Sequence, residues 1–343
     1  MEAARERRIG RAALVFLLIG TVFLFMVLRE LTFLYIPPDR ERVQKVLEIP
    51  EGATLRQTAR ALFNNGLITR VESFVVVGKL LAIERNIIPG EYAFHTQMLP
   101  LEIIGLIKNG RTIQYEITIP EGYTLAQISR VVKEKGLAHP DEFIRRATDP
   151  VFIQSLGLDV GSLEGYLYPE SYFFSKRVGS EGILRALAKR FRAVYTPEME
   201  KRAEEIGMTR QEVVTLASII EKETSVEGER PVISAVFHNR IKKKIPLQSD
   251  PTVIYGLPNF NGNLTRKNLK MYSPYNTYRI KGLPPGPIAN PGKASLLAAL
   301  YPEVSDYLFF VSKNDGTHYF SKTLTEHNRA VQKYQKRRSV KAK

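Results

Sequence analysis

Two glutamates at the end of one apolar segment are the residues best placed to do chemistry. The stretch VVTLASIIEKETS, residues 213–225, puts Glu221 and Glu223 directly after two isoleucines. A carboxyl at an apolar border can serve as a general acid, because desolvation disfavours its charged form and keeps its proton on near neutral pH. A glutamate at a solvated helix end is the ordinary alternative, so this segment alone leaves both interpretations open.

A helix is predicted to carry these two carboxylates. MTRQEVV has the residues of a capping box, with Thr209 as the N-cap and Glu212 three positions on. At about 100° per residue, Glu221 and Glu223 fall on opposite flanks of the apolar stripe, about 160° apart. At most one of them can then face a substrate, and the helical wheel does not choose between them. The residues opposite the stripe, expected to face water, are Thr215, Ser218 and Lys222.

Three other segments carry side chains that suit sugars. Residues 163–174 (LEGYLYPESYFF), 247–257 (LQSDPTVIYGL) and 273–292 (SPYNTYRIKGLPPGPIANPG) combine Tyr, Asn, Gln and Asp with Pro-Gly turns, outside any regular period. Such side chains supply flat apolar faces and neutral hydrogen bonds for sugar rings and acetamido groups. Each segment alone reads as an ordinary loop, but three of them in one chain favour a glycan site.

The blocks LASIIEKET, LQSDPTVIYGL, YNTY, GLPPGPIANPG and LEGYLYPESY together resemble the endolytic murein transglycosylase family, the MltG or YceG-like proteins. The resemblance runs from the N-terminal apolar segment to about residue 334. It implies an enzyme that cleaves peptidoglycan strands between N-acetylmuramic acid and N-acetylglucosamine and leaves a 1,6-anhydromuramoyl end. The reaction is then a lyase step that trims or terminates nascent strands. The resemblance also implies no cofactor and no metal, with peptidoglycan synthases as candidate partners.

The catalytic residue follows from the resemblance and not from the helical wheel. The family's glutamate is the first of the EKET block, which is Glu221 here. Protonated, it would donate to the glycosidic oxygen, and as a carboxylate it would then accept the proton of the C6 hydroxyl. Because that hydroxyl attacks C1 of its own sugar, neither a positioned water nor a second carboxylate is needed.

Six residues in the polar segments are candidates for holding the sugar rings and acetamido groups. In an extended stretch Asn276 and Tyr278 share one face, and we expect them to face the cleft that receives Glu221, with residues 282–292 as its wall. Asp250 precedes a proline, so it also suits a turn or a helix cap. The candidates are Glu170, Gln248, Asp250, Tyr275, Asn276 and Tyr278.

Two rival functions remain compatible with these patterns. One is a membrane-tethered protein that binds peptidoglycan without cleaving it, for which a basic surface is also suitable. The other is a muramidase, a hydrolase whose product is heavier by one water than the anhydro product of a lyase.

A repeat precedes these blocks. LEIPEGATLRQTARALFNNGLI (residues 47–68) and ITIPEGYTLAQISRVVKEKGLA (residues 117–138) share one design. Each predicts a short strand, a Pro-Glu-Gly turn, a helix capped by Thr54 or Thr124, and a glycine, Gly66 or Gly136, at the helix end. A second helical stretch follows. The order strand–helix–helix–strand in the first copy resembles the LysM glycan-binding module.

The N-terminus predicts the compartment. Residues 12–28 are uncharged and almost wholly apolar, and the following LTFLYI extends the segment to a length that can cross a bilayer. Arginines precede it, which predicts a cytoplasmic N-terminus and a single-pass protein of the cytoplasmic (inner) membrane with its catalytic domain outside the cytoplasm. A cleaved signal peptide is the rival, although no small-residue cleavage site follows. The arginines are Arg5, Arg7, Arg8 and Arg11.

Composition bounds the remaining possibilities. The 343 residues are 44% hydrophobic, enough for a packed core, and carry a formal charge of +15. The absence of cysteine excludes disulfides and thiol nucleophiles. A basic chain suits an anionic partner, but no zinc-finger spacing or RNA-binding motif supports nucleic acid.

We therefore predict an α+β protein in five segments. They are a cytoplasmic N-terminus (1–11), a transmembrane anchor (12–36), a LysM-like module (44–113), a larger mixed α+β catalytic domain (114–335) and a basic tail (336–343).

Overall fold

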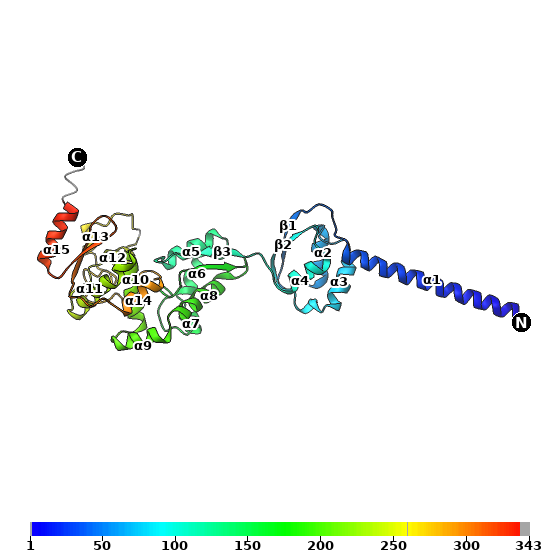
Figure 1. Ribbon diagram of the computed structural model, residues 1–343, viewed down its shortest axis with the longest axis horizontal. Helices are drawn as coiled ribbons and strands as arrows, with labels where there is room; N and C mark the ends of the chain where they lie inside the picture. The colour runs from blue at the N-terminus through cyan, green and yellow to red at the C-terminus, as the bar shows by residue number, and fades with distance from the viewer. Residues whose placement is uncertain (1, 259, 337–343) are drawn as a thin grey trace, which may run out of the picture. The chain divides into compact units, whose positions relative to one another are not determined.

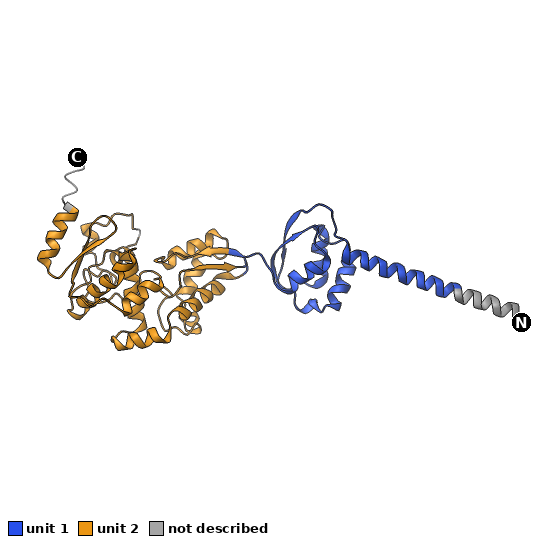
Figure 2. Ribbon diagram, viewed as in Figure 1, with its two compact units in different colours: residues 1–115, 175–177 blue, residues 116–174, 178–343 orange. Residues whose placement is uncertain are grey.

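The structure is a computed structural model that describes residues 2–258 and 260–336. The chain divides between Tyr115 and Glu116 into two compact units, and Ser175–Arg177 belong to the first (Figure 2). Of the predicted basic tail, residues 337–343 lie outside the described residues. The described elements are helices and short strands together, which confirms the mixed α+β class.

The first unit is a small helical module around one antiparallel strand pair (Figure 1). β1 pairs with β2 in the register Gln44↔His95 to Ile49↔Gly90. Its elements are α1 (Glu2–Tyr35), β1 (Gln44–Ile49), α2 (Leu55–Asn64), α3 (Val71–Leu80), the 3₁₀ turn η1 (Ile83–Arg85), β2 (Gly90–His95) and α4 (Pro100–Lys108). Its core gathers apolar side chains from both strands and from α2, α3 and α4.

Helix α1 contains the predicted apolar segment. Leu14–Tyr35 is long and apolar enough to cross a membrane by length and composition, and residues 14–29 within it are all exposed. A signal sequence near the N-terminus would meet the same description. Phe33, close to the end of α1, is only 2% exposed and joins the core of the first unit. The helix is therefore tied to the folded module at its C-terminal end.

The predicted repeat is confirmed in its local geometry. Thr54 and Thr124 each cap a helix through a complete capping box with the glutamine three residues on. Gly66 and Gly136 follow the two helices with φ of +65° and +66°. In this left-handed conformation a residue without Cβ carries no steric penalty, which explains the glycines.

The second unit is larger and mostly helical (Figure 1). β3 pairs with β4, and β5 pairs with β6 in the antiparallel register Phe309↔Ser321 to Ser312↔His318. Its first half contains β3 (Tyr115–Thr118), α5 (Leu125–Glu134), α6 (Pro140–Ala147), α7 (Pro150–Ser155), β4 (Ser171–Phe174), α8 (Gly179–Val194) and α9 (Pro197–Glu205). Its second half contains α10 (Arg210–Glu223), η2 (Glu227–Glu229), α11 (Arg230–Lys242), α12 (Asp250–Tyr255), α13 (Arg266–Lys270), α14 (Lys293–Leu300), β5 (Phe309–Ser312), β6 (His318–Ser321), α15 (Leu324–Val331) and a π-helical turn (Gln332–Lys336).

Helix α10 forms as predicted, with Thr209 as its N-cap, but it is not amphipathic. Every residue from Val213 to Ile220 is buried. The expectation that Thr215 and Ser218 face water is therefore wrong, and only Lys222 of that set is exposed. Ser218 is buried because the loop before α14 covers it: its hydroxyl oxygen accepts the Ile288 N–H at 3.0 Å. A helix that is covered all round is a core element, and only its last turn is free to present polar groups.

Candidate active site

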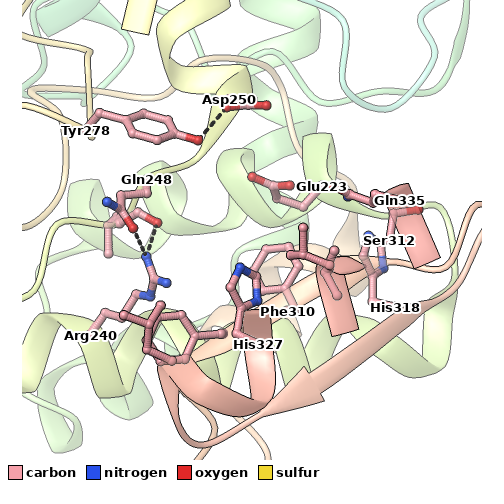
Figure 3. A pocket seen from close by; sticks show the side chains of 15 residues that line it. Glu223, Arg240, Gln248, Asp250, Tyr278, Phe310, Ser312, His318, His327 and Gln335 are labelled. Carbon is pink, nitrogen blue, oxygen red and sulfur yellow. Dashed lines mark hydrogen bonds between the residues drawn. The ribbon is translucent and has the colours of Figure 1, made fainter. Parts of the chain in front are cut away.

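A cavity of about 460 Å³ lies at the C-terminal end of α10 (Figure 3). Glu223 lines it, together with three of the predicted substrate-binding residues: Gln248, Asp250 and Tyr278. The opposite wall comes from β5, β6, α15 and the π turn after it. The wall residues are Phe309, Phe310, Val311, Ser312, His318, Leu324, His327, Val331 and Gln335.

Glu223 is held in this cavity by the segment before α12. Its Oε1 accepts a short hydrogen bond from the Ser249 hydroxyl. Burial raises the pKa of Glu223 to about 7, and the nearby charge of Asp250 acts in the same direction, whereas the Ser249 hydrogen bond and Arg240 oppose the shift. A carboxyl of this kind still carries its proton in a large share of molecules at neutral pH.

Glu221 lies in a different environment. Its Oε2 accepts the Gly292 N–H at 3.0 Å, and its Oε1 is 3.5 Å from Nη2 of Arg230. The side chains of Arg230 and Glu221 are only 10% and 6% exposed. Glu221 therefore joins α10 to α11 and to the start of α14, and it does not line the cavity. The two carboxylates point to different places, as the helical wheel predicts.

Arg240 organises one side of the cavity. Its guanidinium donates to the carbonyl oxygens of Leu247 and Leu308 at 2.9 and 2.6 Å and to Oε1 of Gln248 at 3.2 Å. It also lies 5.1 Å from the centre of the Phe309 ring. The backbone of Gln248 has a φ of +54°, a left-handed conformation that residues other than glycine rarely adopt. These hydrogen bonds and the Gln248 N–H to Thr277 carbonyl bond of 3.0 Å hold it there.

Tyr278 and Asn276, expected to share a cleft-facing side, have separate roles. The Tyr278 hydroxyl lies in the cavity and donates to Oδ1 of Asp250 at 2.7 Å. Asn276 is 1% exposed, and its amide donates to the carbonyls of Leu269 and Met271 at 3.1 and 2.6 Å. Its Oδ1 accepts the Tyr278 N–H at 3.0 Å. Asn276 thus fixes the turn that presents Tyr278, and it has no free polar group for a sugar.

Two further candidates lie away from the cavity. Glu170 precedes β4 and forms a two-pronged ion pair with Arg190, at 2.6 and 2.8 Å. Tyr275 packs its ring against Tyr255, with centroids 4.8 Å apart. The predicted wall, residues 282–292, contacts Glu221 through Gly292 and does not line the cavity that contains Glu223.

A histidine in the same cavity has no counterpart in the sequence prediction. Nδ1 of His318 lies 2.7 Å from Oε2 of Glu229, and its backbone N–H donates to Oε1 at 2.8 Å. Because a carboxylate oxygen accepts, Nδ1 of His318 is the donor in this contact. Glu229 also lies 3.5 Å from the hydroxyl of Thr224, the C-cap of α10. The strand HYFS gives no sequence signal that its first residue lines the same cavity as Glu223.

Comparisons with known proteins agree on one family. Residues 47–333 match the family model of the YceG-like family. An endolytic murein transglycosylase of Bacillus subtilis (strain 168) is 34% identical over 307 residues, covering 84% of each chain. One from Streptococcus pneumoniae serotype 2 is 28% identical over 319 residues, which are 82% of this chain and 57% of the longer relative. The crystal structure of a YceG-like protein from Listeria monocytogenes has a TM-score of 0.59 at 34% identity, covering 84% of this chain and all of that one.

Proposed function

The chain belongs to the YceG-like family, and from this premise we propose that it is an endolytic murein transglycosylase whose proton donor is Glu223. Relatives that bear this name match most of the chain, so the substrate is peptidoglycan and the reaction is of the lyase type. The observation that carries the residue assignment is the cavity: Glu223 lines it together with Gln248, Asp250 and Tyr278, whereas Glu221 does not.

The assignment replaces the one that the family resemblance implied. Glu221 is engaged by the Gly292 N–H and faces Arg230, so proton donation from it would require breaking an internal contact. Within the described residues the Glu223 carboxyl has one hydrogen bond, from Ser249, and its raised pKa supplies a protonated carboxyl near neutral pH.

The chemical step then needs only one carboxyl. Glu223 gives its proton to the glycosidic oxygen as the C1–O bond of the muramoyl residue breaks and positive charge develops at C1. The Glu223 carboxylate next accepts the proton of the C6 hydroxyl, whose oxygen closes on C1 to form the 1,6-anhydro ring. The proton count balances, and Glu223 ends protonated for the next cleavage. Attack within one sugar ring has the advantage of a high effective molarity.

A second function is favoured by one observation. Asp250 lines the same cavity as Glu223, and two carboxylates in one cavity are the equipment of a hydrolase. In this alternative the protein is a muramidase. Against it, Asp250 already accepts the Tyr278 hydroxyl, which suits an orienting role.

Product mass decides between the two reactions. The full-length protein is incubated with purified sacculi, and the soluble fragments are analysed by mass spectrometry. We expect anhydromuramoyl ends, lighter by one water than hydrolysed ends. Hydrolysed ends alone would establish the muramidase, and no fragments from a folded protein would favour a binding protein without catalysis.

The anchor and the small module complete the proposal. The apolar helix α1 and its tie to the first unit through Phe33 support a membrane-anchored protein with the catalytic unit outside the cytoplasm. The strand–helix–helix–strand order of β1, α2, α3 and β2 supports a LysM-like module that binds glycan. A reporter that is active only after export, fused after Lys343, tests the topology, and activity of a cytoplasm-only reporter there would contradict it.

A further inference from the structure

A second cavity, of about 640 Å³, lies beside the one that contains Glu223. Its walls are the first turns of α5, one residue of α6, the last turn of α10, α12 and the chain that follows α12. No catalytic role described above uses it. The lining residues that matter here are Ala126, Arg130, Glu164, Lys222, Ile254 and Phe260.

The two cavities share two walls. On α10, Glu223 lines the first cavity and the preceding residue, Lys222, lines the second. On α12, Asp250 lines the first and the next residue, Pro251, lines the second. The two cavities therefore adjoin the same helix end and the same start of α12.

The second cavity combines an apolar surface with two cations. Ile144, Ile254, Leu257 and Phe260 contribute apolar area. Arg130 is exposed and makes no ion pair or hydrogen bond with any residue that the structure describes. In the part of the chain that the structure describes, Nζ of Lys222 has one hydrogen-bond partner, the backbone carbonyl of Gly122 at 3.3 Å, and no ion pair. Both positive charges are thus available to an anionic ligand.

The carboxyl in this cavity does not offer a competing free anion. Glu164 is buried and accepts from the Leu125 N–H at 2.9 Å, from Nδ2 of Asn290 at 3.1 Å and from the Tyr255 hydroxyl at 3.2 Å. Burial raises its pKa to about 7, partly offset by these donors. Its role is to join α5, α12 and the loop before α14, which makes the cavity a built compartment.

We propose that this second cavity binds the stem peptide of peptidoglycan, with Arg130 and Lys222 contacting its free carboxylates. The inference rests on the proposed function, because it takes the peptide-bearing strand as the substrate. A stem peptide is attached to the lactyl group of the same muramoyl residue that is cut. It has alanine methyl groups for the apolar wall and free carboxylates for the cations, so both its position and its chemistry suit the compartment.

The test compares two forms of one substrate. Uncrosslinked strands that keep their stem peptides are set against the same strands stripped by an N-acetylmuramoyl-L-alanine amidase. We expect the full-length protein to cleave the peptide-bearing strands with a kcat/KM about 10-fold higher, the effect of one charge-assisted contact. In R130Q this ratio should fall towards 1, through a higher KM for the peptide-bearing form.

Two further variants make the result specific. Ala126 is exposed on the first turn of α5 and lines the cavity, so A126F should obstruct it without disturbing the core and should also lower the ratio. Lys133 lies on the same helix, is exposed and does not line the cavity, so K133Q should leave the ratio unchanged. K222Q is less decisive because Lys222 adjoins Glu223.

The possible outcomes distinguish the proposed peptide site from the proposed transglycosylase activity. Equal cleavage of both substrates by the natural chain, or a ratio that R130Q and A126F leave intact, would overturn the peptide site while transglycosylase activity stands. Failure to cleave either substrate would contradict the proposed function instead.

Discussion

The last turn of α10 presents two carboxylates in two opposed environments. Glu223 lies in a cavity, has one hydroxyl partner and has a pKa raised to about 7. Glu221 lies against Arg230 and accepts the backbone N–H of Gly292. The same residue type thus has a raised pKa in a cavity on one side of the helix and holds neighbouring segments together on the other. The difference arises from the neighbours and not from the helix itself.

The largest effect should come from removing the proton on the cavity side. E223Q keeps the size and can still accept the Ser249 hydrogen bond, but it cannot donate a proton to the glycosidic oxygen. We expect strand cleavage to fall about 10²–10⁴-fold, with a melting temperature no lower than that of the natural chain. Cleavage is followed by chromatography of soluble muropeptides, and retention of most activity would remove Glu223 from the mechanism.

The pH dependence of strand cleavage should report the titration of Glu223. If Glu223 acts as an acid, kcat/KM should fall about tenfold per pH unit above its pKa of about 7. If buffer and salt controls leave the alkaline loss of activity unchanged and its midpoint lies far from pH 7, another group is the acid.

The same group should affect stability. The pKa of Glu223 in the folded state lies above the reference value of 4.5, so its contribution to the free energy of unfolding is complete below about pH 4.5 and declines as pH rises towards 7. E223Q should lack this share of the decline when urea unfolding is measured at pH 5 and pH 8.

On the other side of the turn, E221Q should lower stability more than chemistry. The substitution removes the carboxylate that lies 3.5 Å from the Arg230 guanidinium and leaves Glu121 as the anion near it. We expect the free energy of unfolding to fall by roughly 1–3 kcal/mol. Activity per folded molecule should stay within a few-fold of the natural chain. A stable but inactive E221Q would reverse the comparison and restore the assignment that the family resemblance implied.

Asn276 offers a sharper version of the same contrast within one loop. N276A removes three hydrogen bonds made by a buried side chain, so the free energy of unfolding should drop by about 1–3 kcal/mol. Thermal unfolding is the readout. Loss of cleavage with an unchanged melting temperature would instead make Asn276 a substrate contact.

The smallest effect is expected from the Tyr278 hydroxyl. Y278F removes the hydrogen bond that orients Asp250, and we expect kcat/KM to fall about 5-fold, which corresponds to about 1 kcal/mol. Y275F is the matched control, because Tyr275 does not line the cavity, and its kcat/KM should be unchanged. Equal losses in both variants would indicate a general effect on the loop.

Local signals were sufficient to predict much of this architecture. The capping boxes at Thr54, Thr124 and Thr209 and the helix-ending glycines depend on a few neighbouring residues, so the sequence reveals them. The sequence also indicates Gln248, Asp250 and Tyr278, which line the cavity, because each lies in a segment of polar and aromatic residues without a regular period. The angle between Glu221 and Glu223 follows from helix geometry alone.

The choice between the two glutamates could not be predicted in the same way. It depends on which segments cover each flank of α10, and those segments are distant in the chain: Gly292 and Arg230 on one flank, and the β5–β6 pair on the other. The prediction that Thr215 and Ser218 face water is wrong for the same reason, since segments distant in the chain bury both residues. His318 was missed because only its tertiary contact with Glu229 sets its orientation.

The wall of the first cavity has a consequence for how the protein is made. His327 of α15 and Val331 and Gln335 after it close the cavity around Glu223, and a ribosome produces them long after the glutamate. Glu223 is therefore synthesised before the segments whose packing completes its burial and raises its pKa. We therefore expect a chain truncated before Leu324 to keep Glu223 but to lack the wall that encloses it.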